Sequence, residues 1–449
     1  MIKQKLKDIK EGKLSAEDNI KNFINKIKKE NKNLNIVLHL NDEAVKQAKE
    51  VDKKIKSSKA GKLAGLGVLI KSNINVNGLI CNCASKTLEN YKAGYNATII
   101  DKLLNEDCII LGMANMDEFA CGASGETSAF GPCKNPRALS RIPGGTSSGP
   151  AAGVAAGFCD FSIGSDTGGS IRQPSSLCGV VGMRPSYGMI SRYGLVDMTM
   201  SFDTIGPLGN SVEDCEIVFN IIKGKDERDS VTRDFENKKK DLKKLFVGVL
   251  KINSDKDVWD LVRKRIEEVC KEKGWKAEDA FLDYVDLGIQ TYYPIVYTEF
   301  FSGTRKFDGR KFGYKIEDVC GEEVLRRILG GEEITKAEYG GQYYRKALIA
   351  KKLIEKQFEK AFKKYDVIVF PTCPKLPHKL GTKISVEDMY NYDACTVLAS
   401  LAEIPGISVP CGTLKDGKED IPVGLQLLAW KGDDENLLQI AKDFQILAL

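Results

Sequence analysis

Residues 143–173 hold the densest set of side chains that could do chemistry. Two clusters of glycine and hydroxyl residues, GGTSS at 144–148 and TGGS at 167–170, bracket a helical pattern of small residues and a strand pattern. Small residues let a backbone approach a ligand closely, and the N–H groups of a glycine turn can stabilise a developing oxyanion. Ser170 ends the second cluster, where a serine is well placed to act as a nucleophile.

Other interpretations of these glycines fit less well. A phosphate-binding loop requires GxxxxGK[ST] and a dinucleotide fingerprint requires GxGxxG, and this stretch contains neither pattern. An α/β-hydrolase elbow requires GxSxG together with a histidine. The two histidines of the chain, His39 in an expected helical region and His378 in a proline-rich loop, lack that context. A tight turn of small residues accounts for one cluster but does not easily account for both.

A serine nucleophile needs a general base, and the scarcity of histidine points to a lysine. A buried lysine can serve because desolvation lowers its pKa and favours the neutral amine. Lys71 lies in GVLIKSNINV, within the unbroken apolar run of a buried strand. A single lysine in a strand is usually an edge or surface residue, but its combination with the two clusters favours the role of base. We therefore predict that Ser170 is a nucleophile and that Lys71 is its base.

The composition restricts the class of protein that carries these residues. The 449 residues are 42% hydrophobic and 29% charged, as in a globular protein with a large core, and the net charge of +5 indicates no nucleic-acid footprint. We see no apolar run that would span a membrane and no signal or transit peptide. Thirteen scattered cysteines without a CxxC pair indicate buried reduced thiols. We expect a cytoplasmic protein that binds no metal.

The pattern of elements around these residues predicts an α/β fold. Short apolar runs bounded by glycine alternate with helical patterns from residue 65 onward, as in a sheet that helices largely cover. Later runs, LFVGVLKI, YDVIVFPTCP, ISVPCGTL and IPVGLQLLAW, read as further strands, the last two as a closing pair. We predict a single domain over 1–449. Its parts would be N-terminal helices (1–60), a core (61–224), a mostly helical insertion (225–345) and a return to the sheet (346–449).

These features resemble the amidase signature family, which uses a Ser–cis-Ser–Lys triad. The family's spacing falls on Lys71, Thr146 and Ser170. The resemblance implies that Lys71 is the base, that Thr146 relays the proton and that Ser170 attacks the amide carbon. It also implies a large mixed β-sheet covered by helices on both faces, with a helical insertion. The oxyanion hole would be formed by the backbone N–H groups of Thr167, Gly168, Gly169 and Ser170.

The chain departs from the family pattern at the middle residue of the triad. Position 146 is threonine where the family has serine, and Ser148 and Pro150 stand where the family usually has glycine and serine. A threonine hydroxyl can relay a proton, but its methyl group must fit beside a peptide bond that the family holds in cis. We expect this bond to be cis here, with the Thr146 hydroxyl within hydrogen-bond reach of both Lys71 and Ser170.

Within the family, the resemblance is closest to the A subunits of glutamyl-tRNA(Gln)/aspartyl-tRNA(Asn) amidotransferases and runs nearly end to end. Blocks that carry it include NMDEFACGASGETSAFGPCKNP, RKFDGRKFGYK, GEEVLRRILGG and LAEIPGISVPCG. It implies that the chain releases ammonia from glutamine. A B subunit would use ATP and Mg²⁺ to activate the glutamate or aspartate on a misacylated tRNA, which it would mainly hold, and a small C subunit would brace the pair.

Free glutamine presents a carboxylate and an ammonium, so its pocket needs a cation and an anion. The resemblance places these roles on Arg327 and Asp393, with Tyr292 lining the site. Two alternatives remain. A free-standing amidase for small amides would leave Arg327 and Asp393 unpaired, which is costly. A non-catalytic scaffold subunit is favoured only by the threonine at position 146.

Overall fold

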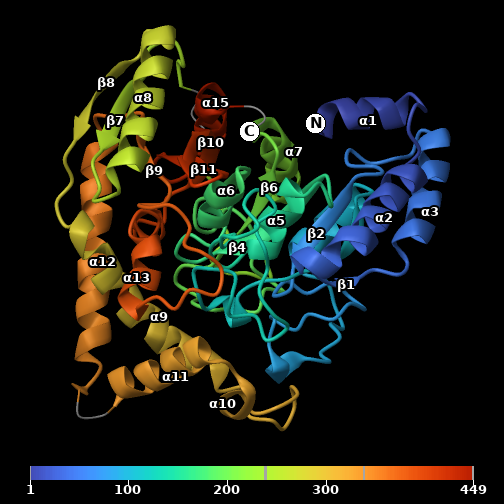
Figure 1. The fold of residues 1–449 in the computed structure, drawn as a ribbon, viewed down its shortest axis with the longest axis horizontal. Coiled ribbons are helices and arrows are strands. Elements are labelled where there is room, and N and C mark those ends of the chain that lie inside the picture. Colours follow the sequence, from blue (N-terminus) through green and yellow to red (C-terminus); the bar gives the residue numbers. More distant parts are fainter. Residues whose placement is uncertain (1, 237–239, 337–338, 447–449) are drawn as a thin grey trace.

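The computed structural model describes residues 2–236, 240–336 and 339–446, and its strands form one sheet between layers of helices (Figure 1). The strands are β1 (Val37–Leu40), β2 (Gly67–Lys71), β3 (Ile109–Ala114), β4 (Phe161–Asp166), β5 (Val181–Arg184), β6 (Thr204–Gly209), β7 (Phe246–Leu250), β8 (Lys276–Ala280), β9 (Val367–Pro371), β10 (Gly406–Asp416) and β11 (Glu419–Leu428). The α-helices are α1 (Ile2–Lys10), α2 (Ala16–Leu34), α3 (Ala44–Lys56), α4 (Thr98–Asn105), α5 (Ser148–Ala155), α6 (Arg172–Cys178), α7 (Val212–Ile222), α8 (Lys256–Lys273), α9 (Gly288–Thr304), α10 (Ile316–Val319), α11 (Glu322–Thr335), α12 (Gln342–Ala361), α13 (Val386–Tyr390), α14 (Val397–Leu401) and α15 (Asp434–Phe444).

The sheet mixes parallel and antiparallel pairs in the order β1-β3-β2-β4-β6-β5-β10-β11-β9-β7-β8. β2 is parallel to both of its neighbours, β3 and β4, which makes it an interior strand. β10 and β11 form a long antiparallel hairpin that joins the N-terminal strands to β9, β7 and β8. The predicted α/β fold with a large mixed sheet is therefore confirmed.

Alternate residues of each strand enter opposite layers of the core, because successive side chains of a strand point to opposite faces. Val68 and Ile70 of β2 belong to the layer that contains α4, α7, α8 and α15. Leu69 belongs to the layer of α2, α3 and α5, and the helices α9, α11, α12 and α14 cover the same face farther along the sheet. Lys71 lies two residues after Leu69 and therefore points toward α5.

Most of the elements expected from the sequence are present. Ser15 caps α2, its hydroxyl oxygen accepting a hydrogen bond from the N–H of Asp18. The apolar runs expected as strands form β7, β9 and the β10–β11 pair. The expectation that residues 1–60 form only helices is wrong at 37–40, which form β1 against β3. A four-residue strand is too short for its periodicity to stand out in the sequence. The segment 225–345 contains β7 and β8 as well as helices.

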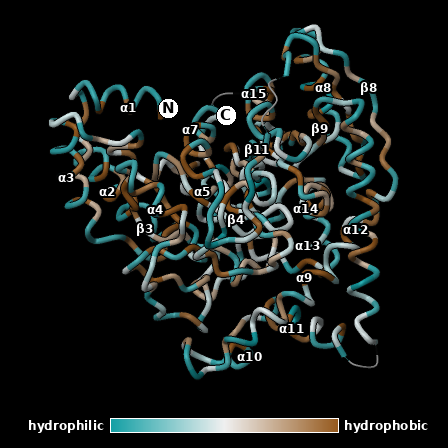
Figure 2. The backbone as a smooth tube through the Cα atoms, turned by 180° about the vertical axis from the view of Figure 1, so that it is seen from behind, coloured by the Kyte–Doolittle hydropathy of each residue, from teal (hydrophilic) through white to brown (hydrophobic). Residues whose placement is uncertain are grey.

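Hydrophilic residues dominate the outlying helix α1, whereas hydrophobic segments run through the interior of the molecule (Figure 2). Within the described part of the chain, no helix combines the length and the apolar character needed to cross a membrane.

Candidate active site

Lys71 ends strand β2 and is 0% exposed. Its Nζ lies 2.7 Å from Oγ1 of Thr146, 3.0 Å from Oγ of Ser165 and 3.2 Å from the Ser165 carbonyl oxygen. Burial lowers the pKa of Lys71 to about 7, although nearby carboxylates act in the opposite direction. The amine can therefore be neutral near neutral pH, and a neutral amine can accept a proton.

Thr146 and Ser170 lie in two adjoining turns, one before α5 and the other between β4 and α6. The N–H of Ser147 donates to the Ser170 carbonyl oxygen at 3.0 Å, which holds the two turns together. Ser170 is 8% exposed, so its side chain is buried but not sealed from solvent. In the described part of the chain, the Thr146 hydroxyl contacts Lys71 but forms no hydrogen bond with the Ser170 hydroxyl.

The peptide bond before Thr146 differs from the expectation. The described residues contain no cis peptide bond, so the Gly145–Thr146 bond is trans and the expectation of a cis bond is wrong. The trans form is about 3 kcal/mol lower in energy when no proline is involved. The Thr146 hydroxyl reaches Lys71 from this trans backbone.

The TGGS turn at 167–170 has no room for side chains at its two glycines. A Cβ at Gly168 would lie 2.6 Å from the Tyr292 hydroxyl oxygen, and a Cβ at Gly169 would lie 2.1 Å from Oγ1 of Thr396. Gly169 also has a φ of 146°, which other residues rarely adopt. Among the described residues, no acceptor takes a hydrogen bond from the N–H groups of Gly168, Gly169 or Ser170. These groups are therefore free to donate to an oxyanion at this turn.

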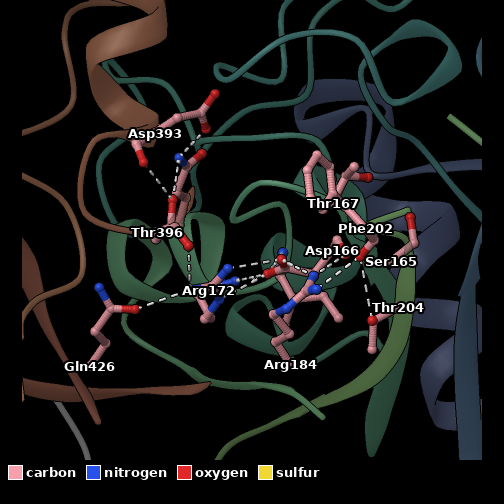
Figure 3. Close-up of polar contacts among 12 residues, drawn as sticks. Ser165, Asp166, Thr167, Arg172, Arg184, Phe202, Thr204, Asp393, Thr396 and Gln426 are labelled. Atoms are coloured by element: carbon pink, nitrogen blue, oxygen red, sulfur yellow. Dashed lines mark hydrogen bonds and ion pairs between the residues drawn. The ribbon is translucent and has the colours of Figure 1, made fainter. Parts of the chain in front are cut away.

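A buried ionic network supports the TGGS turn (Figure 3). The Asp166 carboxylate accepts hydrogen bonds from Arg172 at 2.9 Å and from Arg184 at 3.0 Å, and all three side chains are fully buried. Arg172 also donates to the Thr396 carbonyl oxygen at 2.9 Å and to Oε1 of Gln426 at 3.1 Å. Burial alone would raise the pKa of Asp166, but the two guanidiniums hold it well below its usual range. The charged carboxylate thus ties the nucleophile turn to β5, to β11 and to the segment before α14.

Beside this turn, the structure gathers the residues predicted to bind glutamine around Tyr293. The Tyr293 hydroxyl donates to Oδ2 of Asp393 at 2.6 Å, and the Arg327 guanidinium lies over the Tyr293 ring, 5.6 Å from its centroid. Tyr292 stacks on Phe202 and meets Tyr293 edge to face. Burial raises the pKa of Asp393 to about 6, so the carboxylate is the main form at neutral pH. The site therefore holds one cation and one anion close to Ser170's turn.

Arg327 has a partner that the sequence analysis missed. Its Nε donates to Oε1 of Glu323 at 2.8 Å, one turn earlier on α11, and the two side chains are 2% and 5% exposed. Glu323 also pairs with Arg326 and accepts from the Tyr390 hydroxyl at 3.2 Å. The spacing of four residues between Glu323 and Arg327 was a usable signal. The sequence did not tell which of the two adjacent glutamates faces inward.

Two further residues near the site were also missed. Gln173 donates from Nε2 to Oδ1 of Asp393 at 2.6 Å, and Asp203 accepts from the Thr167 hydroxyl at 2.6 Å. Burial raises the pKa of Asp203 to about 6.

Within residues 2–236, 240–336 and 339–446, no group of three or more histidine, cysteine, aspartate or glutamate side chains is arranged to hold a metal ion. The cysteines are free, and all but the half-buried Cys320 are buried, which confirms the expectation of buried thiols.

Comparison with known proteins shows the family to which the chain belongs. The family model described as Amidase matches residues 18–438. The chain belongs to the amidase signature family. Similar members include the A subunit of the glutamyl-tRNA(Gln) amidotransferase of Methanocaldococcus jannaschii, which is 50% identical over 435 residues, 95% of this chain and 98% of the relative. The A subunit of the same name in Methanobrevibacter smithii is 48% identical over 98% of both chains.

Solved structures of the family have the same fold. The crystal structure of the glutamyl-tRNA(Gln) amidotransferase A subunit from Thermotoga maritima is 32% identical and superimposes with a TM-score of 0.82, over 98% of this chain and 96% of that one. A bacterial aryl acylamidase of the amidase signature family is 21% identical, with a TM-score of 0.86 over 98% and 94% of the two chains, and shows a likeness of fold alone.

Proposed function

We propose that this chain is the glutaminase subunit of a cytoplasmic tRNA-dependent amidotransferase. It releases ammonia from glutamine for the conversion of Glu-tRNA(Gln) to Gln-tRNA(Gln), of Asp-tRNA(Asn) to Asn-tRNA(Asn), or of both. The observation that carries the proposal is a buried lysine amine, able to be neutral, 2.7 Å from the Thr146 hydroxyl in the turn that adjoins the nucleophile turn. The whole-length similarity to proteins named for this enzyme supports it.

In this proposal the chain acts within a heterotrimer. A B subunit binds ATP and Mg²⁺ and holds most of the misacylated tRNA, and a small C subunit braces the pair. Ammonia is the product that this chain supplies to the B subunit.

The charged side chains of Arg327 and Asp393 orient glutamine. Asp393 binds the ammonium and Arg327 binds the carboxylate, which leaves the side-chain amide of glutamine to face Ser170. Arg327 uses Nε for Glu323, whereas its terminal Nη1 contacts the Sδ of Met198 at 3.4 Å, a weak acceptor. The end of the guanidinium is therefore available for a substrate carboxylate. A substrate without charges would gain no ion pair from Arg327 or Asp393, so the two charges favour glutamine over an uncharged amide.

The reaction itself proceeds by acyl transfer. The Ser170 oxygen bonds to the amide carbon while its proton passes through the Thr146 hydroxyl to the Lys71 amine. The N–H groups of the TGGS turn stabilise the oxyanion, and the leaving nitrogen takes the proton as ammonia departs. Water then attacks the carbonyl carbon of the γ-glutamyl ester and gives a proton to the Lys71 amine. The bond to the Ser170 oxygen breaks, glutamate leaves, and the proton returns to Ser170 through Thr146. The Thr146 and Ser170 hydroxyls must approach each other in the substrate complex, since such hydrogen bonds often tighten only when substrate binds.

Replacing the nucleophile tests this proposal. Ser170→Ala should abolish ammonia release from glutamine by the assembled complex, because it removes the oxygen that attacks the amide carbon in this proposal. Amidation with ammonium chloride as donor should persist, because it bypasses this chain's chemistry. Ser400→Ala is a matched control: Ser400 is a buried serine on α14 whose hydroxyl, in the described structure, has no hydrogen-bond partner.

The assay also separates the alternatives. A Ser170→Ala complex with near-normal glutaminase activity would end the proposed mechanism. A parent complex that releases no ammonia, yet uses ammonium chloride, would identify a non-catalytic scaffold. A parent chain that hydrolyses small uncharged amides better than glutamine would identify a free-standing amidase.

A further inference from the structure

Gln173, the second residue of α6, lies between Asp393 and the nucleophile turn and is 1% exposed. Its Nε2 lies 2.6 Å from Oδ1 of Asp393, 2.9 Å from the Tyr392 carbonyl oxygen and 3.2 Å from Oγ1 of Thr396. A carboxamide nitrogen carries two hydrogens, so the charged Asp393 and the Tyr392 carbonyl are its strongest acceptors. Gln173 therefore fixes one oxygen of the carboxylate that receives the substrate ammonium.

The same side chain packs against both glycine turns. A Cβ at Gly145, in the turn that carries Thr146, would lie 2.3 Å from Oε1 of Gln173. A Cβ at Gly169 would lie 3.1 Å from Nε2 of Gln173. The N–H of Gln173 also donates to the Gly169 carbonyl oxygen at 2.8 Å. One buried residue thus contacts the relay turn, the nucleophile turn and the ammonium-binding carboxylate.

We propose that Gln173 is a positioning residue that holds the Asp393 carboxylate in register with the Ser170 turn. The inference rests on the proposed function, in which Asp393 binds the ammonium of glutamine. The distance between the substrate ammonium and its reacting amide is set by the substrate. The distance from the Asp393 carboxylate to the Ser170 turn must match that distance in the substrate. The Gln173 carboxamide, which lies between the carboxylate and the two turns, fixes the position of the carboxylate.

Several ionisable groups face Asp393, and together they decide how it titrates. They are Tyr292 and Tyr293 on α9, Arg327 on α11, Asp166 at the end of β4 and Cys373 after β9. Burial raises the pKa of Asp393 to about 6, and the hydrogen bonds from Tyr293 and Gln173 act against that rise. Loss of the Gln173 donor therefore moves the pKa of Asp393 further upward.

Glutamine binding by the assembled complex, made unreactive by Ser170→Ala, tests the proposal without turnover. Gln173→Met keeps the length of the side chain and removes its donor. Isothermal titration calorimetry from pH 5 to 9 should show a Kd for glutamine weakened on the order of tenfold at pH 7, as expected for a lost hydrogen bond to a charged group. The pH below which binding fails should also rise, because Asp393 must be ionised to hold the ammonium.

A control and a second variant make the outcome decisive. Ser400→Ala, which removes a buried hydroxyl without a hydrogen-bond partner in the described structure, should leave the pH of half-binding unchanged. Gln173→Glu keeps the shape and sets a second carboxyl beside Asp393, so it should move that pH upward even if Gln173→Met does not fold.

A folded Gln173 variant with the affinity and pH dependence of its Ser170→Ala background overturns the inference and leaves the proposed function intact. If that background binds no glutamine and the parent complex releases no ammonia, the proposed function itself fails.

Discussion

Replacing Thr146 by valine tests whether its hydroxyl carries the proton between Lys71 and Ser170. Valine keeps the β-branched shape in a fully buried site and removes only the oxygen that lies 2.7 Å from Nζ of Lys71. Lys71 keeps both of its contacts with Ser165, so the amine stays in place. The lost hydrogen bond should cost on the order of 1–3 kcal/mol of unfolding free energy.

The effect on catalysis should be larger than the effect on stability. Loss of a positioned proton-transfer group slows a reaction by roughly 10²–10⁴-fold, which corresponds to about 3–5 kcal/mol of barrier. The measurement is kcat for ammonia release from saturating glutamine, with the unfolding midpoint determined in parallel. Thr146→Ser should retain activity within about a few-fold of the parent, because serine supplies the same hydroxyl donor and acceptor.

A valine variant that hydrolyses glutamine at the parental rate would refute the relay. The next candidate would then be Ser147, whose hydroxyl donates to the Ser165 carbonyl oxygen at 3.0 Å.

Three further predictions concern charge. Glutamine hydrolysis should rise as pH increases through about 7, because burial lowers the pKa of Lys71 to about 7 and only the neutral amine accepts a proton; a kcat profile that stays flat from about pH 6 to 8 would contradict this role. Arg327→Ala should lower kcat/KM for glutamine by an amount equivalent to on the order of 2–5 kcal/mol of transition-state stabilisation, because glutamine loses the cation that binds its carboxylate. The kcat/KM for propionamide, which has no carboxylate, should fall far less. Equal losses on the two substrates would assign Arg327 a structural role. Asp166→Asn should lower the free energy of unfolding in urea by about 3–5 kcal/mol, because the buried Arg172 and Arg184 lose their carboxylate; a loss below about 1 kcal/mol would show that other groups compensate them.

The parts of the site that could be predicted from sequence are those with a strong local signal. Lys71 directly follows the apolar run at 67–70. An unbroken apolar run is typical of a strand covered on both faces, so the burial of Lys71 could be predicted. The glycines of the TGGS turn were informative because the backbone packs so closely that no side chain fits. The β10–β11 pair was recognisable because two long apolar runs follow each other closely.

The remaining parts depend on contacts between distant segments. Gln173 contacts Asp393, 220 positions later, and Asp203 contacts Thr167, 36 positions earlier, so no local pattern links them. Glu323 is one of two adjacent glutamates, and only the packing of α11 against α9 decides which one meets Arg327. The cis bond was expected from resemblance to a family with serine at position 146, and the structure has a trans bond there.

The contact between Arg172 and Gln426 spans 254 positions, and it has a consequence for synthesis of the chain. A ribosome releases Lys71, Thr146 and Ser170 long before it translates Gln426. The catalytic side chains are therefore made well before the β11 residue that contacts Arg172. Contacts of such long range also form late in folding, because their loop-closure entropy must be overcome first. A prematurely terminated product that ends before Gln426 therefore carries the nucleophile and the base but lacks the contact that ties α6 to β11.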